Sequence, residues 1–200
     1  MKAIIQRVMK ASVTVGDEVV GSIGRGLCVL VGISRYDTPK EMEYIVRKVL
    51  NLRLFDDDGG KRWAKNVMDK QFEVLCVSQF TLCVTLKGNK PDFHEAMGPD
   101  LSQQMYQEFL KQLGAAYSPD KVQDGKFGAY MQVNIQNDGP VTIPLECVPA
   151  GPNYSMHLQN DVKKADKRAG KQSSSKVKSD EAADSSPSES PSSPGASGLT

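Results

Sequence analysis

Alternating apolar and polar residues predict a long strand at the start of the chain. Between residues 2 and 15, six apolar side chains share one parity, as in a strand with one buried face: Ala3, Ile5, Met9, Ala11, Val13 and Val15. Arg7 interrupts that face. Residues 16–17, Gly-Asp, predict a turn, and strands are then predicted over 18–23 and over the apolar run 27–33.

Two later segments have the spacing of amphipathic helices. Thr-Pro-Lys-Glu at 38–41 matches a capping box with Pro at the first helical position, and the predicted helix continues to about Leu50. A second helix is predicted to follow Pro99 and to end near Gly114, a natural carboxyl-terminal cap. The apolar positions are Met42, Ile45, Val46 and Val49 in the first helix and Leu101, Met105, Phe109 and Leu113 in the second.

Four more segments rich in apolar residues predict strands, over 52–55, 72–80, 129–135 and 141–145. The run 72–80 continues, after a bend, as far as Thr85. The resulting order β-β-β-α-β-β-α-β-β predicts an α+β fold, built on a largely antiparallel sheet or open barrel that carries two helices.

Composition divides the chain near residue 150. Residues 1–150 hold 12 of the 13 aromatic residues together with 18 acidic and 18 basic side chains, so we predict one neutral folded domain. Residues 151–200 hold one aromatic residue, Tyr154, with seven bases and six acids. Such a segment buries too little apolar surface to offset about 1–2 kcal/mol of backbone entropy per residue, so we predict a disordered tail.

The predicted tail has two parts of opposite charge. Residues 161–178 carry seven Lys or Arg side chains and two acids, whereas the segment from Ser179 onward has four acids, no base and many Ser and Pro residues. A solvated segment without a binding role explains this composition. A nuclear-import or polyanion-binding element, tuned by phosphorylation of nearby serines, explains it equally well.

Composition also excludes several classes of protein. No apolar run approaches the roughly 18 residues of a membrane span, and the amino terminus becomes polar too early for a signal peptide, so we expect a cytoplasmic or nuclear protein. The neutral body argues against a broad grip on duplex DNA. With only His94 and His157, the chain lacks the usual zinc ligands. No C-x-x-C pair occurs among the cysteines, which are predicted to be buried, reduced thiols: Cys28, Cys76, Cys83 and Cys147.

Standard catalytic motifs are absent from the sequence. The glycines of residues 21–26 have the wrong spacing for a dinucleotide-binding loop, and a strand follows them. No G-x-S-x-G elbow occurs, and His94 lies in a polar loop without an evident serine or cysteine partner. The three aspartates at 56–58 fit a solvated turn better than a cation site. We therefore predict no metal site.

Two polar interruptions of apolar strands remain: Ser-Gln-Phe-Thr-Leu at 78–82 and Asn-Asp-Gly-Pro-Val-Thr at 137–142. Buried polar groups in the first cost about 1–3 kcal/mol each unless they are hydrogen-bonded. Backbone carbonyls at a strand bend would satisfy them, and so would a ligand pocket where N–H groups near Phe80 meet a substrate oxygen. In the second, Gly139-Pro140 is either a simple turn or a cis peptide bond.

These two motifs resemble those of the D-aminoacyl-tRNA deacylase family. The resemblance extends to the amino-terminal Met-Lys-Ala-Ile-Ile-Gln-Arg-Val and to Lys-Gly-Asn-Lys-Pro at 87–91, and it spans residues 1–150. Either motif alone is weak, but both in this order are highly specific. The likeness is stronger to the vertebrate members, whose extension the tail resembles and which have also been named DNA-unwinding-element-binding proteins.

The resemblance implies a function and a set of site residues. Members of the family are homodimers that hydrolyse the ester of D-aminoacyl-tRNA, and of glycyl-tRNA, as translation quality control that requires no cofactor. In them a Gly-cisPro of one protomer enters the partner's pocket and rejects L-amino acids by steric exclusion. The family's catalytic motif falls on Ser78, Gln79, Phe80 and Thr81, and its chiral-selection motif on Asn137, Gly139, Pro140 and Thr142.

Neither motif supplies a histidine, and the first contains no carboxylate, so Thr81 has no evident base to activate it as a nucleophile. We therefore expect substrate positioning and backbone donors near Gln79 and Phe80, with the ribose 2′-hydroxyl helping to activate water, as the resemblance implies. The competing hypothesis is a nuclear factor in DNA replication that binds DNA through its basic tail.

Overall fold

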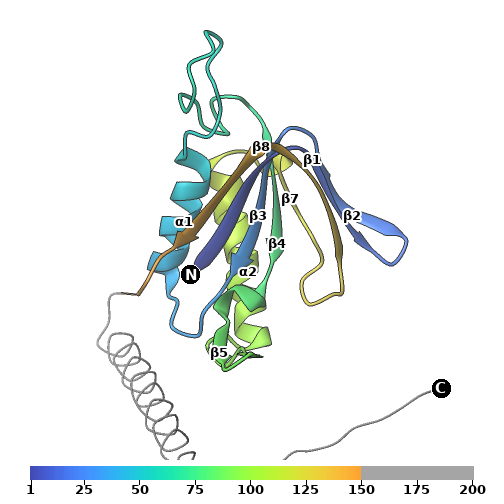
Figure 1. Ribbon diagram of the computed structural model, residues 1–200, viewed down its shortest axis with the longest axis vertical. Coiled ribbons are helices and arrows are strands. Elements are labelled where there is room, and N and C mark those ends of the chain that lie inside the picture. Colours follow the sequence, from blue (N-terminus) through green and yellow to red (C-terminus); the bar gives the residue numbers. More distant parts are fainter. Residues whose placement is uncertain (150–200) are drawn as a thin grey trace, which may run out of the picture. The chain divides into compact units, whose positions relative to one another are not determined.

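The described part of the chain, residues 1–149 of a computed structural model, is a mixed, barrel-like sheet with two long helices (Figure 1). The strands are β1 (Lys2–Val15), β2 (Glu18–Ile23), β3 (Gly26–Gly32), β4 (Glu73–Ser78), β5 (Thr85–Lys87), β6 (Lys90–Asp92), β7 (Val122–Asp124) and β8 (Gln132–Glu146). The helices are α1 (Pro39–Asn51), α2 (Pro99–Ala116) and the short 3-10 helices η1 (Phe80–Cys83) and η2 (Pro119–Lys121).

β1 is the central strand of the sheet. One of its edges pairs antiparallel with β8, and the other pairs antiparallel with β3 over residues 2–8 and with β2 over residues 11–15. β4 adds parallel to β3, and β7 adds parallel to β4. The outer edges of β2 and β7 meet at Gly21, where a Cβ would lie 2.2 Å from the carbonyl oxygen of Asp124. The predicted α+β fold is confirmed, with two parallel pairings that the sequence did not indicate.

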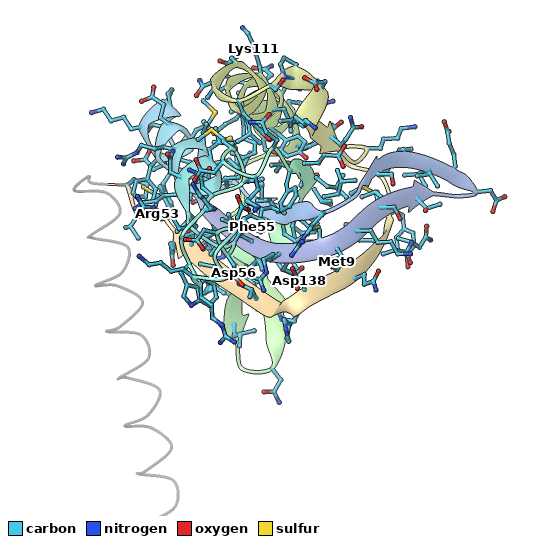
Figure 2. The ribbon with its side chains drawn as sticks, turned by 90° about the horizontal axis from the view of Figure 1, so that it is seen from above. Met9, Arg53, Phe55, Asp56, Lys111 and Asp138 are labelled. Atoms are coloured by element: carbon cyan, nitrogen blue, oxygen red, sulfur yellow. The ribbon has the colours of Figure 1, made fainter. Side chains whose placement is uncertain are left out.

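Alternation along the strands divides the apolar side chains between two cores. One core lies between the sheet and the helices, and it takes Ala3 and Ile5 from β1. The other lies inside the barrel, where Val8 and Val13 of the same strand pack. Both helices cover the same side of β1 (Figure 2).

The parity of β1 changes part-way along the strand. Val8 is fully buried and Met9, which the alternation places on the buried face, is 44% exposed. That prediction is wrong because the register with β8 shifts between Arg7 and Val8 and again before Lys10, so the side chains after the shifts exchange faces. Ala11 and Val13 are buried as predicted.

Both predicted helices are confirmed, but Gly114 is not the cap of the second helix, because α2 continues to Ala116 and Tyr117 caps it. Thr38 and Glu41 form the capping box, in which the Glu41 carboxylate accepts from the Thr38 amide at 2.8 Å, and Pro39 is the first residue of α1.

In α2, Phe109 and Leu113 are buried as predicted, but Leu101 is 64% exposed and Tyr106 is buried in the core instead. Leu101 lies in the first turn of α2.

Three strand predictions need correction. Residues 52–55 form no strand, only an isolated bridge between Phe55 and Lys65. The predicted strands 129–135 and 141–145 are parts of one strand, β8, because continuous pairing with β1 carries the chain through the polar interruption. The run 72–85 is broken after Ser78 by η1, and the polar loop that follows is the hairpin of β5 and β6.

Cys28, Cys76 and Cys83 are buried and Cys147 is half-buried, all with free thiols. The predicted tail, including its basic and acidic parts, lies outside the described residues.

Candidate active site

The site begins where β4 ends and η1 starts. Ser78 pairs with Val31 of β3, and the Gln79 amide donates to the Val31 carbonyl at 2.7 Å. A Cβ at Gly32 would lie 2.7 Å from Leu82 Cβ, so the glycine allows η1 to rest directly on the end of β3. The first polar motif is therefore a turn fixed against the sheet.

The amino end of η1 presents backbone donors. No side chain caps this end, and the first amides of a 3-10 helix, here those of Phe80 and Thr81, have no acceptor within the helix. The Gln79 side-chain amide donates to Thr81 Oγ1 at 2.5 Å. The Phe80 ring is 57% exposed and meets the Phe93 ring edge-on at a centroid distance of 5.1 Å.

A cavity of about 500 Å³ opens beside this turn. Its walls are mostly apolar and come from the ends of β3 and β4, the start of α2 and the loop before β8. The lining residues are Val31, Ile33, Val77, Ser78, Gln79, Phe80, Ala96, Met97, Pro99, Ser102, Phe127, Gly128, Ala129, Tyr130, Met131 and Val133. No histidine or carboxylate is among them. The polar groups that the cavity presents to a substrate are therefore hydroxyls, an amide and main-chain groups.

The thiol of Cys83 and the phenol of Tyr106 do not supply a charged group near the cavity. Burial raises the pKa of Cys83, which ends η1, to about 11, so this thiol is protonated at neutral pH. Burial also raises the pKa of Tyr106, whose ring centroid lies 5.7 Å from that of the lining residue Phe127. Within the described residues the Tyr106 hydroxyl has no hydrogen-bond partner.

The second motif forms a bulge in the middle of β8. Arg7 of β1 pairs with Val141, and the next residue, Val8, pairs with Asn137, so residues 138–140 protrude from the ladder. The Gly139–Pro140 peptide bond is cis and Gly139 has φ +120°. Gly139 and Pro140 are both exposed.

Arg7, noted in the sequence only as an interruption, anchors this bulge. Its Nε lies 3.3 Å from both the carbonyl oxygen and the carboxylate of Asp138, and Nη1 donates to the Leu54 carbonyl at 2.6 Å. Arg25 Nη2 also lies 3.4 Å from the Asp138 carboxylate. Figure 2 shows Asp138 beside the segment that carries Phe55 and Asp56.

Within one chain the two motifs do not meet. Ser78, Gln79 and Phe80 line the cavity, and Thr81 adjoins them through its bond with Gln79. The four residues of the chiral-selection motif lie on the exposed surface of β8 and are not among the lining residues: Asn137, Gly139, Pro140 and Thr142. Sequence reasoning missed the walls formed by residues 127–131 and by Ser102, which no pattern marks.

Neither an ion site nor a membrane helix is found in residues 1–149. No three His, Cys, Asp or Glu side chains there are placed to share an ion, and no helix of that range is long and apolar enough to span a bilayer. The predicted turn at 56–58 is a turn, because Asp57 accepts from the amides of Gly59 and Lys61 at 3.0 and 2.9 Å. Asp58 pairs with Lys70 at 2.9 Å.

Comparison with known proteins assigns the family. Residues 4–146 match the model described as D-Tyr-tRNA(Tyr) deacylase. The chain belongs to this family. Relatives within the deacylase group include D-aminoacyl-tRNA deacylase 1 of Bos taurus, 59% identical over 172 residues that cover 84% of this chain and 82% of the relative. D-aminoacyl-tRNA deacylase of Drosophila melanogaster is 62% identical over 146 residues, 73% of this chain and 92% of that protein.

Two solved structures share the fold of this chain. The structure named c-Myc DNA Unwinding Element Binding Protein has a TM-score of 0.72 and 64% identity, and the match covers 75% of this chain and 100% of that one. A probable eukaryotic D-amino acid tRNA deacylase, at 18% identity and a TM-score of 0.63, covers 73% of this chain and 98% of its own, and shares the fold.

Proposed function

We propose that this protein hydrolyses the ester bond between a D-amino acid and the terminal adenosine of tRNA, and that of glycyl-tRNA, within a domain spanning residues 1–150. Membership of the deacylase family supports this proposal. The observation that carries it is the cavity beside η1, because its apolar walls suit an amino-acid side chain and uncapped amides stand at its edge. Ester hydrolysis needs such donors, which stabilise the negative oxygen of the tetrahedral intermediate.

The proposed reaction uses main-chain groups and the substrate itself. The oxygen of a water molecule joins the carbonyl carbon, the bond from that carbon to the ribose oxygen breaks, and the ribose oxygen takes up a proton from the water. The amides of Phe80 and Thr81 hold the oxyanion, where one donor contributes about 2.7–4 kcal/mol. The ribose 2′-hydroxyl helps to orient the water, and the reaction requires no cofactor.

We further propose a homodimer in which the bulge of one protomer enters the cavity of its partner. Two observations and a steric argument support this arrangement. Within the described residues, β8 pairs on one edge only, and a long open edge favours association. Gly139 and Pro140 are exposed, and they are absent from the lining of their own cavity. Rigid main-chain atoms beside the substrate α-carbon would reject L-amino acids by exclusion while tolerating many D-side chains.

Hydrolysis of D-tyrosyl-tRNA and L-tyrosyl-tRNA by the purified protein tests the proposal. We expect the D-ester to disappear rapidly and the L-ester to decay at the rate of the uncatalysed reaction. Sedimentation of the same preparation reports the dimer. A folded dimer that hydrolyses neither ester would refute the proposed activity.

A second proposed function is DNA binding by the segment 161–178, with seven bases and two acids. The name of the DNA-unwinding-element-binding relative supports it. Deacylation then belongs to the cytoplasm and DNA binding to the nucleus. Truncation after Ala150 should abolish salt-sensitive DNA binding and leave deacylation unchanged, whereas DNA binding by the truncated body would refute the role of the tail.

A further inference from the structure

One exposed aromatic side chain lies beside the bulge, outside the proposed catalytic machinery. Trp63 is 52% exposed, although an indole usually gains more from burial than most side chains. Its backbone has φ +56°, a conformation that side chains other than glycine rarely adopt. An exposed tryptophan held in an uncommon backbone conformation is more typical of a functional contact than of a folding requirement.

The segment that carries Trp63 is held in place by hydrogen bonds. The Phe55 amide donates to Lys65 at 3.0 Å, and the amides of Ala64 and Lys65 both donate to the Phe55 carbonyl at 3.0 Å. The Asp57 side chain fixes the preceding turn through the Lys61 amide at 2.9 Å. Trp63 is therefore presented on a defined support, so binding to it does not first have to order a loop.

Trp63 is linked to the chiral-selection bulge through Arg7. The Arg7 guanidinium carbon lies 5.9 Å from the centroid of the Trp63 ring, and the same guanidinium contacts Asp138. A Cβ on Gly139 would lie 3.3 Å from Arg7 Nη2. One arginine therefore separates the indole from the exposed main chain at Gly139. If the bulge enters the partner's cavity, Trp63 lies at the rim of that cavity.

Two cations precede the indole. Lys61 and Arg62 are exposed, and within residues 1–149 neither has a carboxylate partner. The nearest acids in the sequence are occupied or solvated: Asp57 accepts from backbone amides, Asp58 pairs with Lys70, and Asp56 is exposed. An aromatic face next to exposed cations matches a single nucleic-acid strand, whose bases stack while its phosphates meet Lys or Arg.

We propose that Lys61, Arg62 and Trp63 of one protomer bind the unpaired nucleotides that precede the terminal adenosine of a substrate seated in the partner's cavity. This inference rests on the proposed deacylase function and extends it to the source of affinity for the RNA. The cavity recognises the aminoacyl ester, and the segment 61–63, which we term the rim segment, holds the strand that leads to it.

Kinetics with a full and a minimal substrate test the proposal. Trp63→Ala should lower kcat/KM for D-tyrosyl-tRNA about tenfold, mainly through KM, because stacking contributes about 1–3 kcal/mol per base. It should change hydrolysis of the D-tyrosyl ester of adenosine, which lacks the upstream nucleotides, less than twofold. Trp63→Phe should retain most of the activity on the tRNA. Arg62→Glu should weaken tRNA binding and flatten its salt dependence.

Lys111→Glu on α2 is the matched charge control, because Lys111 is 79% exposed and lies on the side of the molecule away from Asp138 (Figure 2). It should leave both substrates unaffected. Equal losses on the full and minimal substrates with Trp63→Ala would overturn the inference, since Trp63 would then only support the bulge. An unchanged kcat/KM on the tRNA would overturn it as well.

A binding measurement separates this inference from the proposed activity. Trp63 is the single tryptophan of the chain, so its fluorescence reports its own surroundings. Titration of the wild-type dimer with uncharged tRNA, or with a short single-stranded RNA ending in adenosine, should change that fluorescence saturably. A response without ester hydrolysis would support the RNA contact and refute the enzyme. Hydrolysis without a response would refute the contact and leave the enzyme standing.

Discussion

Gly139→Ala is the substitution that most directly tests the proposed chiral selection. An added Cβ would lie 3.0 Å from Val141 Cγ2 and 3.3 Å from both Arg7 Nη2 and the Val141 amide nitrogen, at φ +120°. The first distance is below ordinary van der Waals contact, so Val141 or Arg7 must move. In addition, an alanine adopts this backbone conformation only at a cost of about 1–3 kcal/mol, which favours a shift of the backbone.

The structure sets the size of the expected effects. A loss of about 2 kcal/mol in the free energy of unfolding lowers Tm by about 4–8 °C for a domain of this size. A displacement of the bulge of up to about 1 Å changes a catalytic rate by as much as about 10²-fold, so we expect the ratio of kcat/KM for the D-ester over the L-ester to fall at least about tenfold. Paired assays on D-tyrosyl-tRNA and L-tyrosyl-tRNA measure that ratio.

Gly16→Ala is the matched control. Gly16 also has positive φ, +61°, but a Cβ there meets nothing within 4 Å, and it lies in the turn between β1 and β2. Its replacement should cost about 1–2 kcal/mol of stability and leave the D/L ratio unchanged. If Gly139→Ala lowered Tm while the D/L ratio stayed at the wild-type value, the bulge would not be the chiral filter and the reasoning would fail.

Three further predictions concern the residues around the site. Thr81→Ala should lower kcat less than about tenfold, because the hydroxyl has no base beside it, only the Gln79 amide; a loss of several orders of magnitude in single-turnover assays would mean that Thr81 is the nucleophile. Arg7→Met should lower the free energy of unfolding by about 2–4 kcal/mol, since the Leu54 carbonyl and the Asp138 carboxylate lose a donor. Urea denaturation measures this free energy, and an unchanged value would show that these bonds are unimportant. Burial raises the pKa of Cys83 to about 11, so about one thiol in 10³ is ionised at pH 8. Iodoacetamide at pH 8 should therefore leave activity intact and label Cys83 only after unfolding. Rapid labelling of Cys83 in the native protein, detected by mass spectrometry, would contradict this prediction.

Elements that depend on local interactions could be predicted from the sequence, and elements that depend on contacts between distant residues could not. α1 was predictable because its capping box and helical spacing are local. β8 was divided in two because Asn-Asp-Gly-Pro also matches a turn, and only the pairing with β1, more than a hundred residues away, shows that the strand continues. β5, β6 and β7 have three residues each, too few for an alternation to be recognised. Residues 52–55 include three apolar side chains, and two of these, Leu54 and Phe55, are buried in the core, but no neighbouring strand pairs with the segment beyond one bridge.

The same limit applies to the site. Ser78, Gln79 and Phe80 were identifiable because polar residues interrupt a buried strand, and they do line the cavity. The opposite wall, residues 127–131, carries no pattern, because its position depends on the packing of α2 and β8. Arg7 was visible as a charged residue on an apolar face, but its partners, Asp138 and the Leu54 carbonyl, are distant in sequence.

The pairing of the first strand with the last has a consequence for synthesis of the protein. β1 leaves the ribosome first, yet the whole of one of its edges waits for β8, which ends at Glu146. Until then a row of amides and carbonyls on an apolar strand stays open, and such edges attract other chains. Folding can therefore be completed only after nearly the entire body has been made. When translation slows before β8 is complete, or stops before Glu146, the chain should aggregate or bind chaperones. It should not form a stable, partly folded domain.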